Sequence, residues 1–69
     1  MNGNMINETS KEQAWKIYFL PEESFELKLN KITEKNLLKE LYLLAVQKDN
    51  NRKIRLISEQ AKKNNISFN

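Results

Sequence analysis

The sequence predicts an α+β fold in which an N-terminal β-hairpin packs on an antiparallel pair of helices. Three observations lead to this fold class: two apolar runs, WKIYFL and FELKL, flank a turn with the only proline; a leucine-rich stretch has helical periodicity; and a second amphipathic stretch follows a short polar break. With 69 residues the chain forms one domain at most. We therefore expect a flexible N-terminus at residues 1–10 and a single small domain at residues 11–69.

The β-hairpin is expected at about residues 15–29. Its first run is rich in aromatic and β-branched residues, and its second run alternates apolar and polar positions, which is typical of half-buried strands. The segment Pro21 to Ser24 would form the turn. A short helix is the competing interpretation of the first run, because Ser10 and Gln13 have the spacing of a capping box and Pro21 would end such a helix.

The first helix of the pair is expected at about residues 34–48. Thr33 suits the N-cap position, and Glu34 suits the positive end of the helix dipole. At about 100° per residue the apolar side chains cover nearly half of the circumference, with Leu41 in their midst. They are Leu37, Leu38, Leu41, Tyr42, Leu44 and Ala45. Such a wide apolar face requires more than one neighbouring element.

The second helix of the pair is expected at about residues 52–64. The tripeptide Asp49-Asn50-Asn51 favours a turn rather than a continued helix. Beyond it, Ile54, Ile57 and Ala61 form a narrow apolar stripe at helical spacing. A short turn between two helices predicts that they run antiparallel as a helical hairpin.

The residue types in this chain argue against catalysis and against a bound cofactor. There is no His, no Cys and only one Gly, so the commonest general base, thiolate metal ligands and Gly-rich phosphate loops are all missing. We expect no catalytic residue, no metal ligand and no cofactor. The chain also lacks a run of about 20 apolar residues and a signal-peptide pattern, so we expect a cytoplasmic protein without membrane contact.

Some apolar residues of the two expected helices lie outside the stripes that would face the core. Leu43 and Leu56 lie away from the stripes, with Tyr42 and Val46 at the margin of the first. Apolar side chains with a basic rim are typical of protein-docking sites. The expected partner-binding residues are Tyr42, Leu43, Val46, Arg52, Arg55, Leu56 and Lys63. Alternatively, the two leucines pack on the N-terminal hairpin or on a second copy of the chain.

The small size of the chain favours self-association. Domains of this length usually gain stability from disulfides, metals or oligomerisation, and the missing Cys and His leave the last of these. We therefore expect a homodimer, in addition to a protein partner.

DNA binding is the alternative function. The formal net charge is +3, and one face of the second helix carries the basic residues Arg52, Arg55, Lys62 and Lys63. A strand followed by two helices is the element order of a ribbon-helix-helix repressor, which would direct Glu26, Lys28 and Asn30 into the major groove. Protein docking is favoured over this hypothesis because an acidic side chain at position 26 would lie against phosphates.

The helical half of the chain also resembles known regulatory proteins. The matching residues are Thr33-Glu34, Leu37-Leu38, Glu40, Tyr42, Ala45, Asn51-Arg52, Ile54, Leu56-Ile57, Lys62-Lys63 and Ile66. With one single-residue insertion and one deletion, this pattern is similar to the Sda family of sporulation histidine-kinase inhibitors. The stretch LAVQKDNNRKIRLIS also resembles the IDEAL domain, a helical hairpin of Firmicutes proteins, although Leu43 and Leu44 replace its Asp-Glu. The resemblance implies a small regulatory protein that docks on a larger partner, such as a sensor histidine kinase, and lowers its activity.

Overall fold

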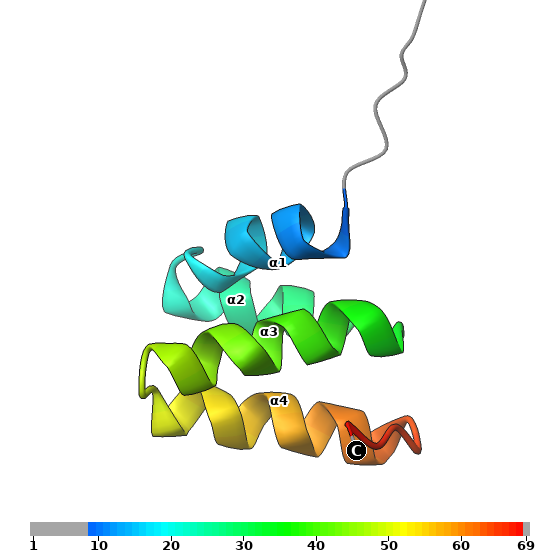
Figure 1. Ribbon diagram of the computed structural model, residues 1–69. Coiled ribbons are helices and arrows are strands. Elements are labelled where there is room, and N and C mark those ends of the chain that lie inside the picture. Colours follow the sequence, from blue (N-terminus) through cyan, green and yellow to red (C-terminus); the bar gives the residue numbers. More distant parts are fainter. Residues whose placement is uncertain (1–8, 69) are drawn as a thin grey trace, which may run out of the picture.

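The computed structural model describes residues 9–68, and helices are the only regular secondary structure in that range. Four helices follow one another along the chain: α1 (Ser10–Tyr18), α2 (Glu22–Leu29), α3 (Lys35–Gln47) and α4 (Asn51–Lys63) (Figure 1). The predicted α+β fold is therefore wrong, because the range expected to form a β-hairpin holds α1 and α2 and no strand occurs between residues 9 and 68. Helices α3 and α4 occupy the two ranges in which helices were expected, with bounds that differ by one residue at each end.

Helix α1 begins at a capping box. The backbone N–H of Glu12 donates to Thr9 Oγ1 at 3.2 Å, and the backbone N–H of Thr9 donates to Glu12 Oε1 at 3.0 Å. This box lies one residue before the Ser10–Gln13 pair that the competing helical interpretation used. Of the expected flexible segment, residues 1–8 lie outside the described range, whereas Thr9 and Ser10 cap and begin α1.

The alternating run FELKL forms part of α2, because its apolar side chains are spaced in a way that a helix can also bury. Phe25 and Leu29 are four residues apart, so they share one helix face and are both buried, whereas Leu27 lies on the opposite face and is 67% exposed. Pro21 is the N-cap residue, and Glu22 and Glu23 in the first turn suit the positive end of the helix dipole. These end signals explain why helix prevails over the predicted strand.

Helices α3 and α4 form the predicted antiparallel hairpin. Helix α3 ends in a Schellman motif, in which Asp49 adopts φ 57° and the N–H of Asn50 donates to the carbonyl of Ala45 at 2.9 Å. The side chain of Asn50 then caps α4 by accepting from the N–H of Lys53 at 3.1 Å. The turn is therefore stabilised by hydrogen bonds on both sides.

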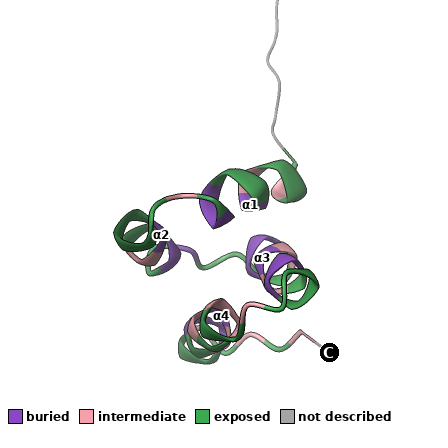
Figure 2. Cartoon of the chain, turned by 90° about the vertical axis from the view of Figure 1, so that its left-hand side faces the viewer, coloured by how far each residue is buried: buried purple, intermediate pink, exposed green. Residues whose placement is uncertain are grey.

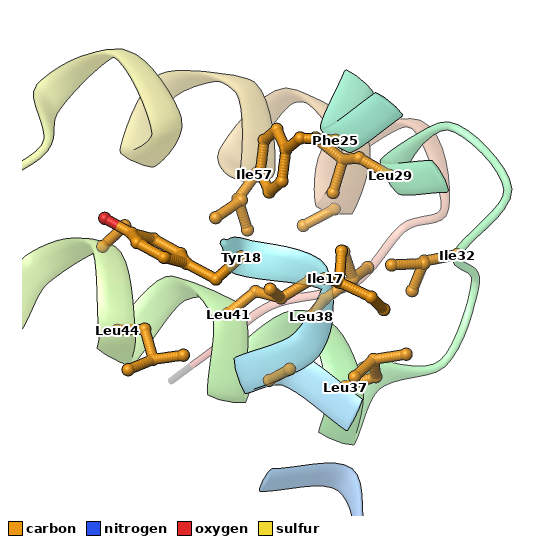
Figure 3. Packing of buried hydrophobic residues seen from close by; sticks show 13 residues of the cluster. Ile17, Tyr18, Phe25, Leu29, Ile32, Leu37, Leu38, Leu41, Leu44 and Ile57 are labelled. Atoms are coloured by element: carbon orange, nitrogen blue, oxygen red, sulfur yellow. The ribbon is translucent and has the colours of Figure 1, made fainter. Parts of the chain in front are cut away.

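The core lies where the four helices meet. Figure 2 shows the buried side of each helix turned toward a common centre, and Figure 3 shows that α1, α2, α3 and α4 all contribute side chains to it. Leu41 is 0% exposed, which confirms its predicted place in the core. The large side chains that are fully buried are Phe25, Leu38, Leu41 and Ile57. Among residues 9–68, no helix is both long enough and apolar enough to cross a bilayer.

Candidate docking surface

Three of the predicted partner-binding residues, Tyr42, Leu43 and Val46, lie on α3. Leu43 and Val46 are each 48% exposed and lie three residues apart on the outer side of the helix. Tyr42 is half-buried, and its ring centroid lies 4.9 Å from that of Phe68, so the C-terminal segment folds back on α3. The structure therefore brings these three residues to one side of the molecule.

The remaining four predicted residues lie on α4, and they do not join this surface. Leu56 is half-buried and lines a small depression together with Lys63 and residues of α2, so it packs on the N-terminal half of the chain. Arg52 also faces α2, where its side chain pairs with two carboxylates, Glu22 at 2.9 Å and Glu26 at 2.6 Å. Arg55 is exposed. Leu43 and Leu56 thus belong to different faces.

Two aromatic residues that were not among the predicted partner-binding residues extend the α3 surface onto α1 and its C-cap. Trp15 is 47% exposed, Phe19 is 54% exposed, and their ring centroids are 5.0 Å apart. Trp15 lines a shallow hollow between α1 and α3 whose other wall includes Leu43. The sequence signal that could have identified the pair is the helical spacing of the apolar residues Ala14, Ile17 and Tyr18. In a helix these three share the buried face, and Trp15 and Phe19 point away from it.

Leu43 separates two hollows on this side of the molecule. The first is the hollow beside Trp15, and the second is lined by Tyr42, Ile66 and Phe68 together with polar residues of α3 and α4. We refer to the exposed and half-exposed apolar residues along this line as the Leu43 surface. They are Trp15, Phe19, Tyr42, Leu43, Val46 and Phe68.

Charged side chains border the Leu43 surface. Lys48 places its Nζ 5.8 Å from the centroid of the Phe19 ring, within the range of a cation–π contact. Lys11 and Glu40 line the hollow beside Trp15, and Lys39 and Lys62 line the hollow beside Phe68. An apolar centre with a charged border is the usual anatomy of a protein-docking site.

The ribbon-helix-helix hypothesis requires a correction. Glu26 and Lys28 lie within α2, and Asn30 is its C-cap residue, so the segment expected to form the DNA-reading strand is helical. Arg52, one of the cations expected to contact phosphate, is paired with Glu22 and Glu26. The predicted β-ribbon is therefore not formed by these residues.

The described residues also contain no group of three or more His, Cys, Asp or Glu side chains arranged to hold a metal ion. Comparisons of the chain with protein-family models, with curated proteins and with solved structures found no match.

Proposed function

We propose that this chain is a small non-enzymatic regulatory protein that docks on a larger protein through the Leu43 surface. The observation that carries the proposal is the hollow that Trp15 of α1 and Leu43 of α3 line together, with the Phe19 ring 5.0 Å from that of Trp15. These three large apolar side chains are each about half exposed. Aromatic side chains supply much of the binding energy in protein interfaces, because they bury a large area at low entropic cost. The non-enzymatic part of the proposal rests on the sequence, which has no His and no Cys.

The surface is suited to a protein partner because its apolar residues are contributed by separate segments. Trp15, Leu43 and Phe68 come from α1, from α3 and from the C-terminal segment. A contact that spans all three segments would bury exposed apolar area without refolding the domain. The resemblance of the α3–α4 hairpin to the Sda family suggests a sensor histidine kinase as the partner, with inhibition by occupancy as the mechanism.

The test is affinity isolation of the tagged protein from its host, with variants that alter the Leu43 surface. Leu43→Asp and Trp15→Ser should each abolish recovery of the partner while the far-ultraviolet circular dichroism stays unchanged, because both side chains are already half exposed. Arg55→Glu is the matched control, since Arg55 is an exposed residue on α4 outside this surface. Recovery of the same partner by Leu43→Asp and Trp15→Ser would reject the proposal.

A further inference from the structure

A second apolar site lies on a different part of the molecule, between α1 and α2. It is an open groove of about 670 Å³. Its floor is formed by Ile17, Ile32 and Leu37, which are each 7% exposed, and Leu20 and Leu27 line it at the side. Leu27 is the most exposed large apolar residue that the structure describes, at 67%. The groove therefore combines a floor of core residues with one exposed apolar side chain, Leu27, that a ligand can contact.

The charged residues that line this groove all have the same sign. Lys16 of α1, Lys28 of α2 and Lys31 of the following turn line it, and all three are exposed. The uncharged polar residues are Gln13 and Ser24, and no Asp or Glu from residues 9–68 contributes to the wall. Cations around an apolar floor favour a ligand that carries apolar side chains on one face and negative charges beside them.

We infer that this groove binds an acidic amphipathic helix of a partner protein. The apolar stripe of the helix covers Leu27 and the floor, and its Asp or Glu side chains meet Lys28 and Lys31. The inference is independent of the Leu43 surface, because none of the residues of that surface lines the groove.

A helical ligand fits this site better than an extended peptide. Extended peptides bind by adding a strand to a sheet edge or, as polyproline II helices, in grooves lined by aromatic side chains. Residues 9–68 contain no strand, and no aromatic residue lines this groove. A groove between two helices accepts side chains spaced three and four residues apart, which is the spacing along one face of a third helix.

Selection from a displayed library of helical peptides tests the inference even while the partner is unidentified. Panning on the full-length protein should enrich peptides with apolar residues at positions i, i+3, i+4 and i+7 and with Asp or Glu beside them. A synthetic peptide from this enriched class should bind Leu27→Ser roughly tenfold more weakly, as expected when an apolar contact at the centre of an interface is removed. Leu43→Asp should bind the same peptide as wild type does, which separates this result from a failure of the proposed function.

A charge swap provides the sharper arm of the test. The double variant Lys28→Glu/Lys31→Glu should select basic instead of acidic peptides, because the sign of the groove lining is largely reversed. The matched control is Arg55→Glu/Lys63→Glu, which changes the net charge equally at exposed residues of α4 outside both the groove and the Leu43 surface and should still select acidic peptides. Circular dichroism melting verifies that each variant is folded.

Three results would each overturn the inference. The first is a selection that enriches no peptide, and the second is a set of enriched peptides with no excess of acidic residues. The third is equal affinity of the synthetic peptide for wild type and for Leu27→Ser. The protein is also titrated with vesicles of anionic phospholipid and with a single-stranded oligonucleotide. Binding of either probe that depends on Leu27 and Lys28, without binding of acidic peptides, would assign the groove to that other class of ligand.

Discussion

Gln60 of α4 donates a hydrogen bond from Nε2 to the backbone carbonyl of Ile32 at 2.8 Å, across 28 positions of the sequence. The same nitrogen lies 3.3 Å from the carbonyl of Asn30. Gln60 is 5% exposed and is the one buried residue with an amide or charged side chain among the described residues. Buried backbone carbonyl groups need hydrogen-bond donors, and the Gln60 amide is the donor for the two carbonyls in the loop between α2 and α3. A single side chain of α4 thereby holds in place the segment that contains Ile32, a floor residue of the groove between α1 and α2.

Replacement of Gln60 by Leu should therefore destabilise the fold although the new side chain is apolar. The substitution removes the donor and leaves the Ile32 carbonyl without it, which costs about 1–3 kcal/mol of unfolding free energy. Urea unfolding followed by circular dichroism measures the loss. Gln47→Leu is the matched control, because Gln47 is exposed on α3 and its replacement should change the unfolding free energy by less than about 0.5 kcal/mol. Equal stability of the two variants would show that the buried hydrogen bond contributes nothing.

Leu41→Ala should have the largest effect of the single substitutions considered, because Leu41 is 0% exposed. Removal of a buried leucine side chain costs about 2–5 kcal/mol through lost burial and the cavity left behind. Much or all of the stability of so small a domain would then be lost. Leu27→Ala provides the comparison, since Leu27 is 67% exposed and its replacement should leave the melting temperature almost unchanged. A Leu41→Ala protein that melts like wild type would contradict the packing described for α3.

Acidification should weaken the N-terminal cap of α1. The backbone N–H of Thr9 and then its hydroxyl, both hydrogen-bonded to the carboxylate, hold the pKa of Glu12 below the ordinary range of a glutamate. A lowered folded-state pKa means that the contribution of Glu12 is present above the unfolded pKa of about 4.3 and is lost as the pH falls through the folded value. An NMR titration of the Glu12 carboxyl should therefore give a low pKa, which Thr9→Ala raises only partly because the backbone donor remains. An unchanged pKa in Thr9→Ala would exclude a contribution of the hydroxyl.

The two halves of the chain differ in how far their structure could be predicted from sequence. Helices α3 and α4 each have 13 residues, long enough for helical periodicity to be unambiguous. Helices α1 and α2 have 9 and 8 residues, and their apolar runs are equally compatible with strands. The local signals that distinguish the two possibilities are the Thr9–Glu12 capping box and the acidic first turn after Pro21, and the hairpin prediction gave more weight to strand propensity.

The error in the N-terminal half also limited the prediction of the candidate site. The exposure of Leu43 followed from its position on the helix and is confirmed. The hollow beside it requires Trp15, which a strand would have placed differently. Leu56 is half-buried because its neighbours on α2 form one wall of its depression, and sequence spacing within α4 contains no information about them. Contacts between helices therefore account for most of what the sequence did not reveal.

Self-association stays a prediction, and the structure indicates which residue to change. A homodimer would bury exposed apolar side chains in a self-complementary contact, and Trp15 and Leu43, which line one hollow between α1 and α3, are large side chains of this kind. Such a dimer would compete with the partner protein for the Leu43 surface. Sedimentation at micromolar concentration should therefore give the mass of a dimer for wild type and of a monomer for Leu43→Asp. Arg55→Glu, outside this surface, should remain dimeric. If wild type sediments as a monomer and melts cooperatively at a temperature independent of its concentration, the homodimer is excluded, and the Leu43 surface stays open for a different protein.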